Sequence, residues 1–557
     1  MNRWFFNKYE ILRNGFYMLG RFFFSRLFRN QIILIALVIV VLLNLYYLNT
    51  YPVNIAAYDY PNYAGMIYSG SSNLIHASGY AWIMRTFLDV LNISNQVDRF
   101  STSWLENIQL INFSLHLILI AICSLICNKV FGRLSAALMC LAWGGSLFFM
   151  GGVNAVSPDW LQGDLLASAL LTALWAFNVK NHAKIILYVI SALILTLAYL
   201  VKFNSLVVAP IIALLVLFDS KDFIWKVTTA LVSFAASAAL IFLFIENFHY
   251  PSTNTRQLSY DHAWVLIDSL PSNYINQEPS KLGINSLRWR ALGAILPPDY
   301  FRAAAYQDVD WGAPEEIREP YLAQFNYLMN ASRLDLISFA KTYPLPDAYN
   351  VDVSAIPGYY YIGLPQIDSL GIAVYKESIV SSPSAYIEKF YKGILHFFSG
   401  QPTQLTPLKS NSLGLVMGSK IAEDGSVKLS VPMGRMPQHM IYWNPAEKVN
   451  VHGITFFELM YTLTPPAWFY AILAFVSCVV IVNTQTIRKS FQACLLLLST
   501  ILLMSSSLML LGIRFKEILA LLPVTSIFLG FGVSSLILYF KERYTKASML
   551  NLNGESI

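Results

Sequence analysis

The chain has 557 residues, of which 56% are hydrophobic and only 13% are charged, and its mean hydropathy is +0.51. A soluble domain keeps about a quarter of its residues charged, so this composition excludes an ordinary soluble protein and predicts a multispanning membrane protein. The net charge of +6 does not indicate nucleic-acid binding, because many of the basic residues flank apolar runs.

The first 30 residues are basic and aromatic. They hold six Lys and Arg side chains among Trp, Phe and Tyr, a composition typical of a segment lying on an anionic inner leaflet. A solvated basic tail that only sets orientation fits the same residues equally well. The apolar run at 31–48 is too long for the core of a signal peptide, and no small-residue cleavage site follows it.

Apolar segments long enough to cross a membrane follow along the chain. A spanning helix needs about 20 mostly apolar residues, and about ten segments approach that length. They lie at 31–49, 107–128, 134–152, 163–179, 184–201, 204–218, 226–246, 461–484, 491–512 and 518–540. The predicted fold class is therefore mainly α, a polytopic membrane helix bundle of about ten or more spans.

The connections between these segments alternate in charge. Every second connection is basic, including Lys129 with Arg133 and Arg488 with Lys489. The positive-inside rule then places both termini in the cytoplasm. We expect a multi-pass plasma membrane protein of the bacterial inner membrane, with its active site on the extracytoplasmic face.

This topology divides the chain into five parts. The long polar segment at 247–457 has mixed short patterns and the amphipathic stretch SPSAYIEKFYKGILHFF, which favour a separate extracytoplasmic α+β domain. The predicted parts are a cytoplasmic basic amphipathic segment (1–30), a transmembrane module (31–246) with a first outer loop (50–106), the outer domain (247–457), the C-terminal transmembrane helices (458–541) and a cytoplasmic tail (542–557).

Ionisable residues recur at the outer ends of the predicted spans: Asp59, Asp159, Lys202 and Arg514. A charge at the edge of the hydrocarbon is costly unless it pairs or faces a watery cavity, so it indicates function by default. Singly, each could be an interfacial anchor, and the two cations could snorkel. Four at one membrane surface, with both signs present, favour a shared site.

Such a layer suits transfer of a sugar from a lipid phosphate. Cations would neutralise charge developing on the leaving phosphate, and a carboxylate would take the proton of the acceptor. Asp59, in the stretch PVNIAAYDYPNY, is the candidate general base. A partly dry cleft would raise its pKa above the usual value and make it a better base.

Several short motifs carry a family resemblance. YDY supplies an acid in the first outer loop, IHASGYAWI contains His76, SPDWLQGD contains Asp159, LVKFNSLVVAP contains Lys202 and RFKEILALLP contains Arg514. In order and location they resemble the motifs of GT-C fold glycosyltransferases, the superfamily of protein O-mannosyltransferases and lipid A aminoarabinose transferases. The chain departs from that pattern by lacking the loop prolines and by having Phe203-Asn204 in place of Pro-Thr.

The resemblance implies an inverting transfer from a polyprenyl-phosphate sugar to an extracytoplasmic glycan, lipid or protein acceptor. Asp59 would be catalytic, and Lys202 with Arg514 would bind the donor phosphate. Asp159, Tyr60 and His76 would bind the acceptor or sugar, although an interfacial aromatic belt accounts for the tyrosine equally well. No cofactor is predicted, and no residue spacing indicates a metal site.

Asp164 and His116 are polar residues within predicted spans. Asp164 could substitute for Asp159, or it could be an N-cap, because Gly163-Asp164 opens the predicted span at 163. His116 lies in an apolar run and is expected to be a satisfied core histidine.

Three other functions compete with glycosyl transfer. A lipid-linked glycan transporter or flippase would place polar residues near the middle of its spans, in two related halves. An O-antigen ligase or polymerase would use a similar donor but move a whole glycan. A non-catalytic assembly or sensor protein would leave the ordered charged motifs without a role.

Overall fold

The structure is a computed structural model, and it describes most of the chain. The described residues are 26–50, 60–74, 76–93, 102–179, 183–219, 222–260, 262–271, 274–297, 313–345, 355–398, 419–421, 427–429, 456, 459–460, 467–510 and 515–554.

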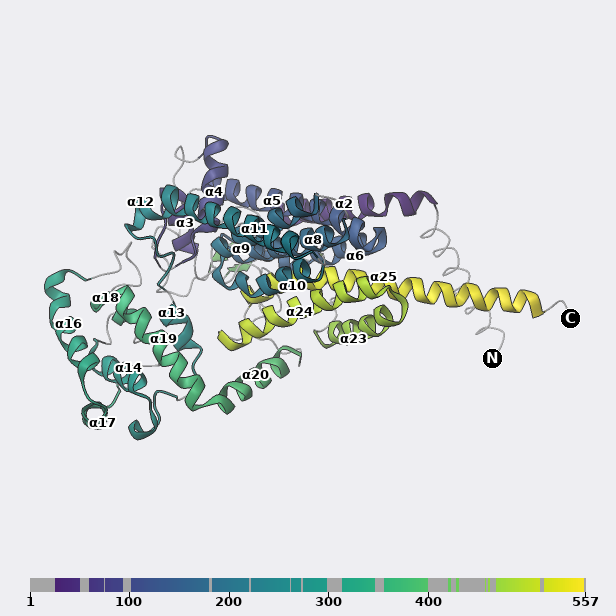
Figure 1. The fold of residues 1–557 in the computed structure, drawn as a ribbon. Helices are drawn as coiled ribbons and strands as arrows, with labels where there is room; N and C mark the ends of the chain where they lie inside the picture. The colour runs from purple at the N-terminus through teal and green to yellow at the C-terminus, as the bar shows by residue number, and fades with distance from the viewer. Residues whose placement is uncertain are drawn as a thin grey trace.

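Long helices lie side by side and form a bundle (Figure 1). They are α2 (Arg26–Leu48), α5 (Thr102–Phe131), α6 (Arg133–Gly144), α7 (Leu147–Val153), α8 (Asp159–Asn178), α9 (Ala183–Val201), η1 (Phe203–Val208), α10 (Ala209–Asp219), α11 (Phe223–Phe244), α23 (Ala467–Thr484), α24 (Ile487–Leu510) and α25 (Phe515–Gly554). A π-helical turn, η2 (Ile245–His249), and α12 (Tyr250–Thr253) continue α11.

Within the described residues, each of the ten predicted apolar segments overlaps helix in this bundle. Among the described residues, seven helices are long and apolar enough to cross a membrane, and the bent pair α6–α7 would make an eighth. The other two segments form shorter apolar helices, Phe203–Asp219 and Phe469–Thr484. The protein is thus a polytopic helical membrane protein, while the count of ten spans stays a prediction.

The segment predicted as one span at 134–152 is broken. Helices α6 and α7 meet at 59°, and Ser146 caps α7 by accepting the backbone N–H of Phe149. At the break, Asn44 of α2 donates its side-chain amide to the Gly144 carbonyl at 2.9 Å. A Cβ at Gly144 would collide with Val40, so glycine permits this close contact.

Helix α8 lies at the centre of the bundle. Of its apolar window, 94% is buried, against 11% for the span that contains α11. It packs on α5, α9 and α25, and Gly163 brings it against the backbone of Leu519 in α25. A polar group on α8 must therefore find a partner within the protein.

The described part of the first outer loop includes two helices. It contains α3 (Tyr60–Ser69) and α4 (Gly79–Val90), which pack on one another, and α4 also contacts α5 and α9. Arg85 of α4 braces the pair by donating to the Tyr68 carbonyl at 2.6 Å.

A second group of helices has its own hydrophobic core beside one end of the bundle (Figure 1). It comprises α13 (His262–Asp268), η3 (Pro279–Lys281), α14 (Ile284–Ile295), α16 (Glu315–Asn330), α17 (Arg333–Thr342), α18 (Ala355–Tyr361), α19 (Leu364–Ser381) and α20 (Pro383–Phe398). We call the described residues within 258–398 the helical domain. Strands β1 (Ser419–Ile421) and β2 (Val427–Leu429) pair antiparallel, with Ser419 opposite Leu429. The α+β character expected for 247–457 stays a prediction.

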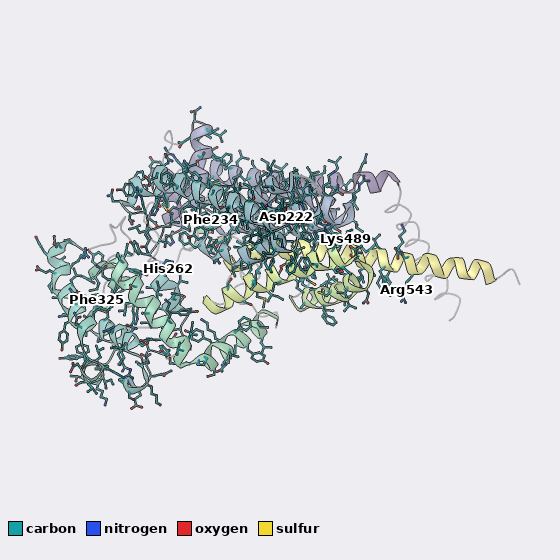
Figure 2. All side chains as sticks on the ribbon, viewed as in Figure 1. Asp222, Phe234, His262, Phe325, Lys489 and Arg543 are labelled. Carbon is teal, nitrogen blue, oxygen red and sulfur yellow. The ribbon has the colours of Figure 1, made fainter. Side chains whose placement is uncertain are left out.

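The bundle has two distinct ends. The helical domain lies at one end, while the start of α2 and the end of α25 lie at the other (Figure 1). Figure 2 shows Lys489 and Arg543, both predicted to be cytoplasmic, toward the end away from the domain. Which side of the membrane each end faces, and the domain boundaries drawn from the sequence, stay predictions.

Candidate active site

Asp159 and Lys202 form an ion pair between the first residue of α8 and the end of α9. The Asp159 side chain is 5% exposed and that of Lys202 is 23% exposed. Ser157 donates its hydroxyl to the second carboxylate oxygen of Asp159 at 2.5 Å. Asp159 takes one of the three N–H donors of the ammonium, so the two other N–H groups could donate to an anion.

A second polar contact joins α8 to η1, directly after Lys202. The Gln162 amide donates to the Asn204 side-chain oxygen at 2.5 Å and to the Ser205 hydroxyl at 3.0 Å. Ser205 in turn donates to the Ala198 carbonyl, at the end of α9. These contacts hold the break between α9 and η1 against α8, which fixes the position of Lys202.

Gly79, which begins α4 in the first outer loop, packs against this break. A Cβ at Gly79 would lie 2.4 Å from the backbone carbon of Leu200, two residues before Lys202. Earlier in the same loop, Ser72 bonds to His249 Nδ1 at 2.7 Å, and the Leu74 carbonyl accepts the N–H of Tyr260 at 2.7 Å. Tertiary contacts therefore set the loop path.

A row of aromatic rings connects this loop with the start of α8. The Tyr63 ring lies 5.7 Å from that of His76 and 5.8 Å from that of Tyr80, whose ring lies 6.5 Å from Trp160. The Tyr80 hydroxyl donates to Asn112 at 3.1 Å. Burial raises the pKa of the Tyr80 phenol above its ordinary value, so it stays a neutral donor.

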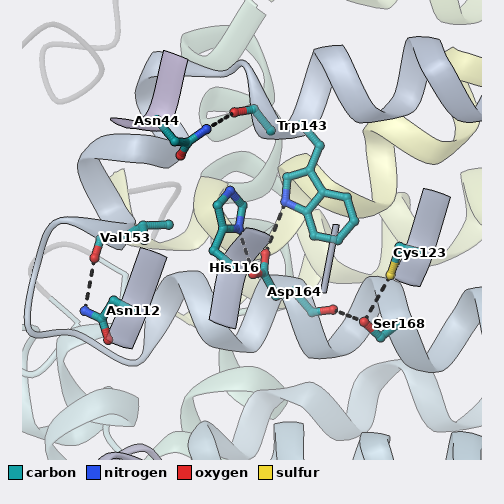
Figure 3. Close-up of polar contacts among 9 residues, drawn as sticks. Asn44, Asn112, His116, Cys123, Trp143, Val153, Asp164 and Ser168 are labelled. Atoms are coloured by element: carbon teal, nitrogen blue, oxygen red, sulfur yellow. Dashed lines mark hydrogen bonds and ion pairs between the residues drawn. The ribbon is translucent and has the colours of Figure 1, made fainter. Parts of the chain in front are cut away.

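A buried polar cluster lies farther along α8 (Figure 3). His116 Nδ1 of α5 is 2.8 Å from one Asp164 oxygen, and Trp143 Nε1 of α6 donates to the other at 3.1 Å. The side chains of His116 and Asp164 are fully buried. The cluster joins three helices and fixes the position of α8 along the bundle. It thereby also fixes the position of Asp159, at the start of α8.

The predicted roles of Asp164 and His116 have different outcomes. The N-cap hypothesis for Asp164 is wrong, because α8 begins at Asp159 rather than at 163, and Asp164 lies inside the helix. His116 is a core histidine as expected, although its Nε2 has no hydrogen-bond partner within the described part of the chain.

The remaining predicted site residues are described only in part. Asp59 and Arg514 lie outside the described residues, as does the side chain of Tyr60, the first residue of α3. His76 is half-buried, and its backbone N–H donates to Asn73 at 2.7 Å. The predicted chemical roles of these residues, and those of Asp159 and Lys202, stay predictions.

The end of the bundle that carries Lys202 also holds the start of α25. Leu519, in the first turns of that helix, packs on Gly163 of α8, one turn from Asp159. Among the described residues, no group of three or more His, Cys, Asp or Glu side chains could hold a metal ion.

No protein-family model and no curated protein matches the chain. Among solved structures it is similar to the archaeal oligosaccharyltransferase AglB from Archaeoglobus fulgidus, solved with an inhibitory peptide and a dolichol-phosphate. The two share 12% sequence identity with a TM-score of 0.41, and the match covers 95% of this chain. The chain spans about half of that protein, 52% of its length. At this level the similarity carries no argument about substrates.

Proposed function

We propose that this protein is a membrane glycosyltransferase of the GT-C type that transfers a sugar from a polyprenyl-phosphate donor. The observation that carries the proposal is the Asp159–Lys202 pair, where the start of α8, the end of α9 and the first outer loop meet. A cation held there by a buried carboxylate suits a lipid phosphate whose tail lies in the membrane.

In the proposed reaction, an acceptor hydroxyl oxygen attacks the anomeric carbon of the donor sugar. The bond from that carbon to the phosphate oxygen breaks, and its electron pair leaves with the polyprenyl phosphate. Asp59 takes the hydroxyl proton as general base. The configuration inverts because attack and departure occur on opposite faces of the sugar.

The other predicted residues have supporting roles in this scheme. Lys202 and Arg514 neutralise the charge that develops on the leaving phosphate. Asp159 orients Lys202, and with Tyr60 and His76 it borders the acceptor or sugar. The acceptor is an extracytoplasmic glycan, lipid or protein, and the helical domain, beside the first outer loop, is placed to help select it.

The test is transfer by the purified protein in liposomes, supplied with a polyprenyl-phosphate monosaccharide and an extract of envelope glycans and lipids. Release of polyprenyl phosphate is measured. We expect release by the wild type and a loss of at least about 100-fold in Asp59→Asn, the scale of general base catalysis. Asp89→Asn is the matched control, because Asp89 is an exposed acid in the same outer loop.

Near wild-type release by Asp59→Asn would show that Asp59 is not the base. If monosaccharide donors are inert and only a lipid-linked whole glycan is consumed, the protein is a ligase or polymerase. If lipid-linked glycan crosses the bilayer without release of polyprenyl phosphate, it is a transporter.

A further inference from the structure

Helix α20 has a wide apolar side. The rest of the protein covers only part of that side. Tyr386 is buried, and Phe390 and Ile394 are half-buried on the same side of the helix. The adjoining side carries Ile387 and Tyr391, which are 70% and 59% exposed. Leu395, one turn further along, is 49% exposed and completes a stripe at i, i+4 and i+8, which is one line along a helix surface.

One polar contact anchors α20, and an exposed ion pair borders the stripe. Lys389 donates to the Ser269 carbonyl at 2.5 Å, which ties α20 to the helical domain. Glu388 and Lys392 form an exposed ion pair at 2.6 Å next to the stripe. An apolar stripe bordered by a charged ridge is the pattern of an amphipathic helix that puts one face into lipid and keeps the other in water.

The position of α20 places the stripe beside lipid-facing helices. It contacts α23 and α24, and in Figure 1 it leads from the helical domain along the side of the bundle. Helix α23 exposes Ile472, Phe475 and Val479, at the spacing of one helix face. Helix α20 therefore adjoins a helix with an exposed apolar face, which a membrane would cover in a polytopic protein.

We propose that α20 lies in the lipid leaflet on the domain side of the membrane, with Ile387, Tyr391 and Leu395 among the acyl chains. Glu388 and Lys392 then lie at the level of the headgroups. Separate exposed apolar residues are ordinary, whereas an aligned stripe indicates a covering partner. Phospholipid is that partner here, because α20 continues the lipid-facing side of α23. The helix would hold the domain at a fixed height above the bundle end.

The test uses nitroxide labels on single added cysteines in the full chain, reconstituted in phosphatidylethanolamine–phosphatidylglycerol liposomes. Collision with oxygen reports lipid, and collision with a water-soluble nickel chelate reports water. Ile387→Cys is compared with Phe234→Cys on α11, a span of which only 11% is buried, and with Leu334→Cys on α17. The native side chains at these positions are 70%, 74% and 79% exposed, so the three sites are matched.

We expect the Ile387 label to resemble the Phe234 label, with at least about a threefold higher ratio of oxygen to nickel collisions than the Leu334 label. Labelled wild type gives the background from the native cysteines. A ratio equal to that at Leu334 would overturn the proposal. Spin–spin broadening at Ile387 that disappears on dilution with unlabelled protein would also overturn it, because a second copy would then cover the stripe.

Discussion

Two lysine–aspartate pairs lie at opposite ends of the α9 segment. Lys202 pairs with Asp159 at one end, and Lys184 pairs with Asp219 at 3.0 Å at the other. Their exposures are similar, with the lysine side chains 23% and 15% exposed and the aspartates 5% and 2%. The lysines are 18 residues apart, about 27 Å along a helix. The two pairs differ mainly in location.

We predict that Lys202→Ala weakens donor binding about 10- to 100-fold, because it removes charge-assisted hydrogen bonds to the phosphate. Lys184→Ala likewise removes the cation that pairs with a buried aspartate, and it removes a cation–π contact with Trp225. Lys184, however, lies at the other end of the bundle. Binding of a fluorescent polyprenyl-phosphate sugar, with thermal stability measured in parallel, separates the two effects. Equal donor affinity in both variants would show that Lys202 is structural.

Helix α8 combines a buried body with several polar groups. Membrane helices usually bury small and apolar side chains, and α8 does so at Gly163 and Ala167. Asp164 is one of the exceptions, and its carboxylate is satisfied by His116 and Trp143. Loss of one partner would leave a buried polar group uncompensated.

We predict that His116→Leu and Asp164→Leu each cost about 3–5 kcal/mol of stability, the range for removing one member of a buried pair. The double variant should lose much less than the sum, because neither partner is then stranded. The wild type, the two single variants and the double variant form a double-mutant cycle. Unfolding by SDS in mixed micelles measures the stability of all four proteins.

Ser168→Ala is the control for this cycle on the same helix. Ser168 is buried and donates to the backbone carbonyl of Asp164 rather than to its carboxylate. We expect it to cost about 1 kcal/mol. Strict additivity of the two leucine substitutions would show that His116 and Asp164 do not act as a pair.

At the scale of the molecule, two separate hydrophobic cores divide the described chain. The bundle core includes Trp104, Trp143 and Trp160, whereas the helical domain is built around Trp289 and Tyr359. Domains with their own cores open independently when few contacts cross between them.

We predict that Trp289→Ala costs the helical domain about 3–5 kcal/mol, the range for large core truncations, and leaves the bundle intact. Hydrogen–deuterium exchange in detergent should quicken at α14, α17 and α19 but not at α5 or α8. Tyr327→Ala, at a residue 64% exposed on α16, is the control and should change neither region. Faster exchange in α8 would show that the two cores unfold together.

Hydropathy and charge placement were sufficient to predict the polytopic helical architecture, because the low-dielectric membrane interior imposes length and apolarity on each spanning segment. The same physics singled out Asp159 and Lys202, since a charge in an apolar setting is costly and stands out in the sequence. Neutral polar residues give no such signal, so the contact between Gln162 and Asn204 was not predicted.

Only the tertiary structure decided which polar groups meet. It paired His116 of α5 with Asp164 of α8, broke the predicted span between α6 and α7, and set the first outer loop against the end of α9 through Gly79. These contacts join residues far apart in sequence, and they depend on the fit of whole helices rather than on local pattern. Hydropathy measures the cost of burying each residue alone, whereas packing decides which partner offsets that cost.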